Sequence, residues 1–170
     1  TIPLANAPTS VTYGAGAVWV CGAHGGSAGL TRVDPQTNQV VAQIDVGDSQ
    51  GYECAWAQVQ SDALWVVALD THAQRHDVLE RIDPATNRVL ATIQLQGDIQ
   101  PPIAIAGQDV WASANADVGT ACSVVRVDAQ ANRVKGTLQA NGCQGMLQSA
   151  GSLWLVDGPP GGLRAVTPTP

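Results

Sequence analysis

Two histidines and two aspartates are crowded into one polar segment of the sequence, where they could bind a metal ion. They are Asp70, His72, His76 and Asp77. Neutral imidazoles and carboxylates are suitable ligands for transition metals. No helical or strand period holds this spacing, so a solvated loop is the alternative to a metal site made by Asp70, His72 and His76.

Other arrangements of catalytic residues are absent from the sequence. It contains no Ser/His/Asp motif, no phosphate-binding glycine loop and no facing pair of carboxylates. We therefore predict no catalytic residue and no cofactor. An enzyme built on this chain would depend on His24, His72 or His76 together with a metal ion.

An internal repeat indicates which elements position these residues. Four tryptophans follow tight-turn residues at intervals of 46, 46 and 43 residues, and they are Trp19, Trp65, Trp111 and Trp154. Four antiparallel strands repeated about every 45 residues are typical of β-propeller blades. A β-sandwich is the alternative, but it does not explain the repeat. We expect the four tryptophans to be core residues.

Each unit also contains a hairpin, at residues 30–46, 79–95 and, less closely, 124–140. Asp and Pro open its turn, and Asn suits the left-handed backbone that returns the chain to a strand. The second strand alternates, which predicts an exposed outer strand with one apolar face. In the first unit that face is expected to consist of Val40, Ala42, Ile44 and Val46.

Three arginines recur inside the hairpins, each two residues before an aspartate. The pairs are Arg32 and Asp34, Arg81 and Asp83, and Arg126 and Asp128. Residues two apart share one face of a strand, so we expect local ion pairs. At a surface such a pair contributes about 0–1 kcal/mol.

The repeat predicts an all-β fold, a β-propeller of four four-stranded antiparallel blades in a single domain, 1–170. The expected blades are 8–46, 54–95, 101–140 and 144–168, the last completed by residues 1–4. Residues 1–4 match the end of an outer strand, Thr92–Leu95, while the chain stops within the last hairpin. The N-terminal strand could complete the last blade of the same molecule or of a neighbouring copy. Alternatively, the chain is a fragment of a ring of six to eight blades.

The four cysteines are expected to form two disulfides. No Cys-x-x-Cys pair is present, which disfavours zinc. Cys54 and Cys143 each precede a repeated tryptophan by 11 residues, whereas Cys21 and Cys122 follow the tryptophan strand, and we place all four in loops on one face. The pairing Cys21–Cys54 with Cys122–Cys143 repeats one geometry, so we predict it. Disulfides indicate an oxidising, extracytoplasmic setting.

The same loop face carries the non-repeating polar and aromatic residues, and variation concentrates where binding usually resides. Trp56 lies outside the repeat, near the start of an innermost strand, and it either contacts a ligand or packs locally beside Tyr52. The predicted partner-binding residues are Tyr52, Trp56, His24, Asp70, His72, His76 and Asp77.

Composition excludes several classes of partner. The chain has 170 residues, a net charge of -6 and a single lysine, Lys135, so it offers no basic surface for nucleic acid. It contains no apolar run near the roughly 18 residues of a membrane span, and no membrane insertion is expected. The chain begins with Thr, which suggests a processed product or a piece of a longer protein.

Two runs resemble a known family. Gly14–Val20 and the stretch 32–44, with its Arg-Val-Asp-Pro-x-Thr-Asn pattern, are similar to the bacterial YVTN-type and virginiamycin B lyase-like propeller repeats. The resemblance covers almost the whole chain and implies a propeller, usually of seven blades, with roles from antibiotic lactone opening to surface binding. The lyase's metal-binding His and Glu residues have no recognisable counterpart here.

Three functional hypotheses remain. The first is a secreted or cell-surface, non-enzymatic propeller that binds a protein or glycan partner through its disulfide-braced loop face. The second is a metal-dependent lyase or hydrolase. The third is a structural subunit that forms homo-oligomers by exchanging its terminal strand.

Overall fold

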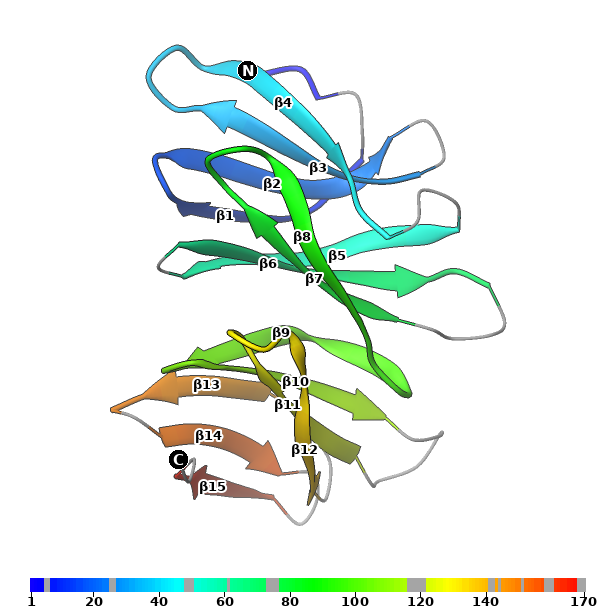
Figure 1. Ribbon diagram of the computed structural model, residues 1–170, viewed down its shortest axis with the longest axis vertical. Helices are drawn as coiled ribbons and strands as arrows, with labels where there is room; N and C mark the ends of the chain where they lie inside the picture. Colours follow the sequence, from blue (N-terminus) through cyan, green and yellow to red (C-terminus); the bar gives the residue numbers. More distant parts are fainter. Residues whose placement is uncertain are drawn as a thin grey trace. The chain divides into compact units, whose positions relative to one another are not determined.

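The computed structural model contains only β-strands as regular structure in the part of the chain that it describes. The described residues are 1–4, 7–24, 27–47, 51–60, 62–72, 77–115, 122–140, 143, 145–150, 152–157 and 161–167. They divide into two compact units, Thr1–Gln94 and Leu95–Pro170 (Figure 1). None of the described residues belongs to a helix able to span a membrane.

Unit 1 (Thr1–Gln94) contains two four-stranded antiparallel sheets with their strands in chain order. The first sheet consists of β1 (Ala7–Gly14), β2 (Ala17–His24), β3 (Ser27–Asp34) and β4 (Gln39–Asp45). The second consists of β5 (Tyr52–Gln60), β6 (Ala63–Asp70), β7 (Val78–Asp83) and β8 (Arg88–Gln94). Each sheet is therefore a simple meander.

Unit 2 (Leu95–Pro170) contains one four-stranded and one three-stranded sheet. The first consists of β9 (Asp98–Ala106), β10 (Asp109–Asn115), β11 (Cys122–Asp128) and β12 (Arg133–Ala140). The last consists of β13 (Gly145–Ser149), β14 (Ser152–Asp157) and β15 (Gly162–Val166). The sheets pack through β9 and β13, which lie side by side (Figure 1).

The all-β fold of four repeated antiparallel sheets is confirmed, with one difference from the predicted blades. The last sheet has three strands, and no described residue supplies a fourth. Residues 1–4 form no strand. Completion of the last blade by these residues, closure into a propeller and the single domain 1–170 all stay predictions.

The hairpin turns have the predicted chemistry. Asn38 has a φ of 57°, and its N–H donates to the carbonyl of Asp34 at 2.9 Å. The Asp34 carboxylate accepts from the Gln36 N–H at 2.9 Å and from the Thr37 hydroxyl at 2.8 Å. These bonds, the one from Gln36 foremost, lower the pKa of Asp34 below its ordinary value. The repeated Asp and Asn are turn residues.

The predicted apolar face of the outer strand is wrong at its first residue. Val40 pairs with Val33, whereas Ala42 pairs with Arg32, so one extra residue bulges between them. Neighbouring residues of β3 point to opposite faces, and a bulge reverses the alternation. Val40 therefore lies on the face opposite Ala42 and Ile44. The second sheet of unit 1 has the same bulge between β7 and β8, and the first sheet of unit 2 has it between β11 and β12.

The repeated arginines pack over the repeated tryptophans instead of serving chiefly as partners for the nearby aspartates. The guanidinium carbon lies 5.1 Å from the ring centroid for Arg32 over Trp19. Arg81 lies 5.9 Å from the ring of Trp65, and Arg126 lies 5.3 Å from that of Trp111. Cation–π contacts of this kind contribute about 0.5–2 kcal/mol. The equivalent residue beside Trp154 is an alanine, Ala165.

Arg32 also ties the first sheet to the second. Its Nη1 donates to the carbonyl of Pro84 and to Oδ1 of Asn87, both at 2.9 Å. Those two acceptors belong to the β7–β8 turn, so the turn residues of one sheet hold the arginine of the preceding sheet. This contact joins the two sheets of unit 1, which the local ion pair expected from the sequence would not do.

The core of unit 1 lies between its two sheets. Trp19, Cys21 and Leu30 of the first sheet are fully buried against apolar residues of the second. Trp65 and Trp111 are buried as well, whereas Trp154 is only partly buried. The prediction of a buried tryptophan is therefore confirmed in three sheets and wrong in the last.

Leu30→Ala is expected to lower the free energy of unfolding by about 2–5 kcal/mol, because it removes a fully buried side chain of β3 from the core between the two sheets and leaves a cavity. Leu90→Ala is the matched control, because Leu90 in β8 is 54% exposed. It should change the free energy by no more than about 0.5 kcal/mol. Urea denaturation measures both, and equal losses would contradict this account of the core.

Candidate binding site on the loop face

The candidate site lies at the end of unit 1 where β2, β4 and β6 end and β3, β5 and β7 begin. In an antiparallel meander, alternate connections emerge at the same end of the sheet. The strand ends His24, Asp45 and Asp70 of β2, β4 and β6 therefore lie at one end, opposite the tight hairpin turns (Figure 1). We call this end the loop face of unit 1.

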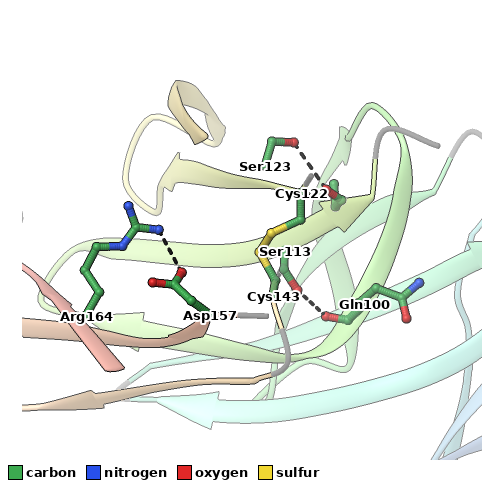
Figure 2. Close-up of a disulfide and its surroundings, with 8 residues drawn as sticks. Gln100, Ser113, Cys122, Ser123, Cys143, Asp157 and Arg164 are labelled. Carbon is green, nitrogen blue, oxygen red and sulfur yellow. Dashed lines mark hydrogen bonds and ion pairs between the residues drawn. A yellow bond between two sulfur atoms is a disulfide. The ribbon is translucent and has the colours of Figure 1, made fainter. Parts of the chain in front are cut away.

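Two disulfides join neighbouring sheets, with the predicted pairing. Cys21 pairs with Cys54, with 5.1 Å between their Cα atoms. Cys122 pairs with Cys143, with 6.0 Å between their Cα atoms (Figure 2). Each bond links one sheet to the chain entering the next, so both pairs of sheets are covalently braced.

The expected loop positions of the cysteines are wrong for three of the four residues. Cys21 lies inside β2, Cys54 inside β5, and Cys122 begins β11, while Cys143 precedes β13. The strands extend further than predicted, and β5 does so through a bulge between Cys54 and Trp56. Cys21 and Cys54 are completely buried.

Three of the predicted site residues come together at the end of β6. The Oδ1 atom of Asp77 accepts the backbone N–H of Asp70 at 2.8 Å, and Oδ1 of Asp70 accepts that of His72 at 2.8 Å. Thr71 donates both its N–H and its hydroxyl to the carbonyl of Gly51 at 2.7 Å. Residues 70–72 are thus pinned to both flanking segments.

Among these residues His72 is the exposed one. Its Nδ1 lies 3.3 Å from Oδ1 of Asp70; the histidine side chain is 67% exposed and that of Asp70 is 7% exposed. A carboxylate beside an imidazole fixes the orientation of the ring. His72 is therefore presented to a partner on a braced backbone.

Two glycines that sequence reasoning overlooked allow this packing. A Cβ atom at Gly51 would lie 1.7 Å from Cε1 of His72, and one at Gly47 would lie 2.4 Å from Cγ of Tyr52. Both glycines have positive φ, 78° and 63°. The rings of His72 and Tyr52 thus lie directly against the backbone. The available signal was a glycine on either side of residues 48–50.

Trp56 does not pack beside Tyr52. Tyr52 pairs with Asp70 and Cys54 with Ala68, whereas Trp56 pairs with Val67, because the strand bulges between Cys54 and Trp56. The bulge places Trp56 on the opposite face of the sheet. It also lies in the middle of β5 instead of near its start. Within the described chain, its buried Nε1 has no hydrogen-bond partner.

The remaining predicted residues are only partly described. The backbone of His24 ends β2, and His76 lies outside the described residues. In the described part of the chain, no three His, Cys, Asp or Glu residues are arranged to hold a metal ion. The metal site of Asp70, His72 and His76 stays a prediction.

Unit 2 contains a polar cluster that the sequence did not indicate. Asp109, which is 5% exposed, accepts from Nε of Arg126 at 2.8 Å and from Nζ of Lys135 at 3.3 Å. Beside it lies a hollow of about 310 Å³, lined by Trp111, Arg126, Lys135, Gly136, Thr137, Leu138, Val166 and Thr167. Arg126 thus donates to Asp109 on the neighbouring strand β10, while its guanidinium lies over Trp111.

No protein-family profile matches the chain, and no curated protein matches it. Solved structures do resemble it. The structure of the Dos1 propeller has 11% identity and a TM-score of 0.65, with 88% of this chain and 42% of that chain covered. Hydrazine synthase of Kuenenia stuttgartiensis has 14% identity and a TM-score of 0.63, with 89% and 51% covered.

A chain in the Mitotic Checkpoint Complex has 13% identity and a TM-score of 0.63, with 91% of this chain and 51% of that chain covered. At such identities the likeness concerns the fold alone, which is the sheet arrangement of β-propellers. The chain spans about half the length of these structures. The more specific resemblance to YVTN-type and virginiamycin B lyase-like repeats gains no support from them.

Replacing Cys21 and Cys54 together by alanine is expected to lower the free energy of unfolding by about 3–4 kcal/mol, since the bond closes a 33-residue separation. Urea denaturation without reductant measures the loss. Replacing Cys122 and Cys143 provides the matched pair, with a slightly smaller loss for a separation of 21 residues. Non-reducing peptide maps that joined Cys21 to Cys122 would contradict the pairing.

Proposed function

We propose that this chain is a β-propeller module, secreted or held at the cell surface, that binds a protein or glycan partner through the loop face without catalysing a reaction. The observation that carries the proposal is the braced segment 70–72, which presents His72 at 67% exposure above an almost buried Asp70. Binding residues are disproportionately found on loops held by a rigid scaffold.

The disulfides support the extracytoplasmic part of the proposal. Such bonds persist in oxidising compartments and are rare in reducing ones. Cys21–Cys54 is buried at 0% exposure for both residues and lies below the loop face, so it stabilises the sheets that carry the site. Completion of the last sheet by residues 1–4, of the same molecule or of a neighbouring copy, is compatible with this proposal.

A photo-crosslinking residue at position 72 should capture the partner, whereas the same residue at Gln36 should not, because Gln36 lies in an exposed turn at the opposite end of the sheet. Glycan binding is tested in parallel on a printed array. Binding should be lost in His72→Ala and kept in Gln36→Ala. Equal capture at both positions, or binding that survives His72→Ala, would refute the loop-face site.

A metal-dependent lyase or hydrolase is the second candidate, because Nδ1 of His72 lies 3.3 Å from a carboxylate oxygen of Asp70. The binding proposal predicts no stoichiometric metal after dialysis against zinc or manganese, as measured by elemental analysis. It also predicts no metal-dependent rise in the melting temperature. One equivalent of metal that disappears in His72→Ala, but remains in Gln36→Ala, would favour the enzyme.

A further inference from the structure

Two sheet faces, one in each unit, are apolar and open. The first, which we call the trailing face, is the side of the β13–β15 sheet that carries Leu147, Trp154, Val156 and Leu163. The second, the leading face, is the side of the β1–β4 sheet that carries Val11, Tyr13, Val18, Val20 and Val33. It is open at Val11 and Tyr13, whereas Val20 and Val33 are 7% and 4% exposed. Contiguous exposed apolar patches on a soluble protein mark interaction sites.

The packing within unit 1 shows what covers such faces. There the Trp19 side of the first sheet is buried against the second sheet, where Ala57 and Leu64 are 3% and 0% exposed. Ile44 and Val46, at the end of the outer strand β4, belong to the same buried cluster. We compare the two open faces with the two sides of this contact.

The trailing face is equivalent to the Trp19 side of the first sheet, but no other sheet packs on it in the described chain. Leu163 pairs with Val156 as Leu30 pairs with Cys21, so the positions are equivalent. Leu163 is 65% exposed, whereas Leu30 is 0% exposed. Val156 is 43% exposed, and the equivalent Cys21 is 0% exposed.

The leading face is equivalent to the face of the second sheet that carries Ala57 and Leu64. Val11 pairs with Val20 as Ala57 pairs with Val66. Val11 is 69% exposed, whereas Ala57 is 3% exposed. Tyr13, on the same face, is 68% exposed. The two open faces are therefore complementary halves of one interface, and both occur on this chain.

The N-terminal segment already occupies part of the leading face. A hollow of about 190 Å³ is lined by Ile2, Leu4, Val18, Val20, Val33, Pro35 and Asn38. Residues Val18, Val20 and Val33 correspond to Leu64, Val66 and Ile82, which share the buried cluster of Ile44 and Val46. Ile2 and Leu4 thus take the place that the end of an outer strand takes on the next sheet.

We propose that a second copy of this chain is the partner of these faces. The trailing face of each copy packs on the leading face of the other, and residues 1–4 of the second copy pair with the open edge of β15. Leu163 then lies opposite Ile2, as Leu30 lies opposite Ile44 and Leu79 opposite Ile93.

A second copy fits two features together. In the described chain the last sheet has three strands, and residues 1–4 belong to no sheet. The two faces differ, so the contact is head to tail, and a reciprocal pair leaves neither face open. This inference extends the propeller architecture and does not depend on binding at the loop face.

Sedimentation equilibrium of the 170-residue chain tests the proposal. The mass should be about 35 kDa, twice the 17.5 kDa of one chain. Val11→Glu alone and Leu163→Glu alone should each weaken association by roughly 100-fold or more, because each buries an unpaired carboxylate. Both residues are exposed in the single chain, so these variants should fold, as checked by near-ultraviolet circular dichroism.

Mixing the two variants gives the decisive measurement. A Val11→Glu chain keeps an intact trailing face and a Leu163→Glu chain an intact leading face, so the mixture should regain a species of about 35 kDa through one undamaged contact. Leu90→Glu, on the exposed outer strand β8, is the matched control and should leave the dimer unchanged.

Three results would overturn the inference: a wild-type mass of 17.5 kDa, a dimer that both variants leave intact, or a mixture that stays monomeric. A monomer that still crosslinks its partner through position 72 would refute the dimer and leave the loop-face function standing. An intact dimer that no longer crosslinks a partner through position 72 would refute the loop-face function and leave the dimer standing.

Discussion

Burial of a tryptophan between two successive sheets is the interaction on which the structure depends. Each sheet of unit 1 is a meander too small to bury an apolar face alone, and the first gains its stability by packing Trp19 and its neighbours against the second. Arg32 covers the ring and reaches the β7–β8 turn of the next sheet. A sheet whose apolar side no other sheet covers therefore keeps that side open to solvent, as at Leu163 and Val11.

The loop face inherits its rigidity from that packing. The Cys21–Cys54 bond crosses between β2 and β5 just below the loops, and β5 bulges immediately afterwards. Above it, Asp77 and Gly51 hold residues 70–72 by backbone hydrogen bonds. A recognition surface on such a support loses little conformational entropy on binding, which favours affinity from a small number of contacts.

The open faces also follow from the packing of one sheet against the next. Trp154 occupies the place of the other repeated tryptophans, yet Ala165 stands where they have an arginine, and Leu163 is exposed. The terminal sheets of a repeat array need either a polar outer face or a partner. Here the outer faces remain apolar, which is why a second copy explains them better than solvent does.

The repeat, the turn chemistry and the disulfide pairing were determined by the sequence alone, because each depends on local backbone preference or on a fixed period. Asn38 and its counterparts have the left-handed φ expected of them, and both cysteine pairs are as predicted. Only the tertiary structure decided which face each side chain occupies. One bulged residue in β5 sends Trp56 away from Tyr52, and another at Val41 reverses Val40, since a shift of one residue exchanges the two faces of a strand. Likewise, the partners of Arg32 are more than 50 positions away along the chain, beyond any local pattern.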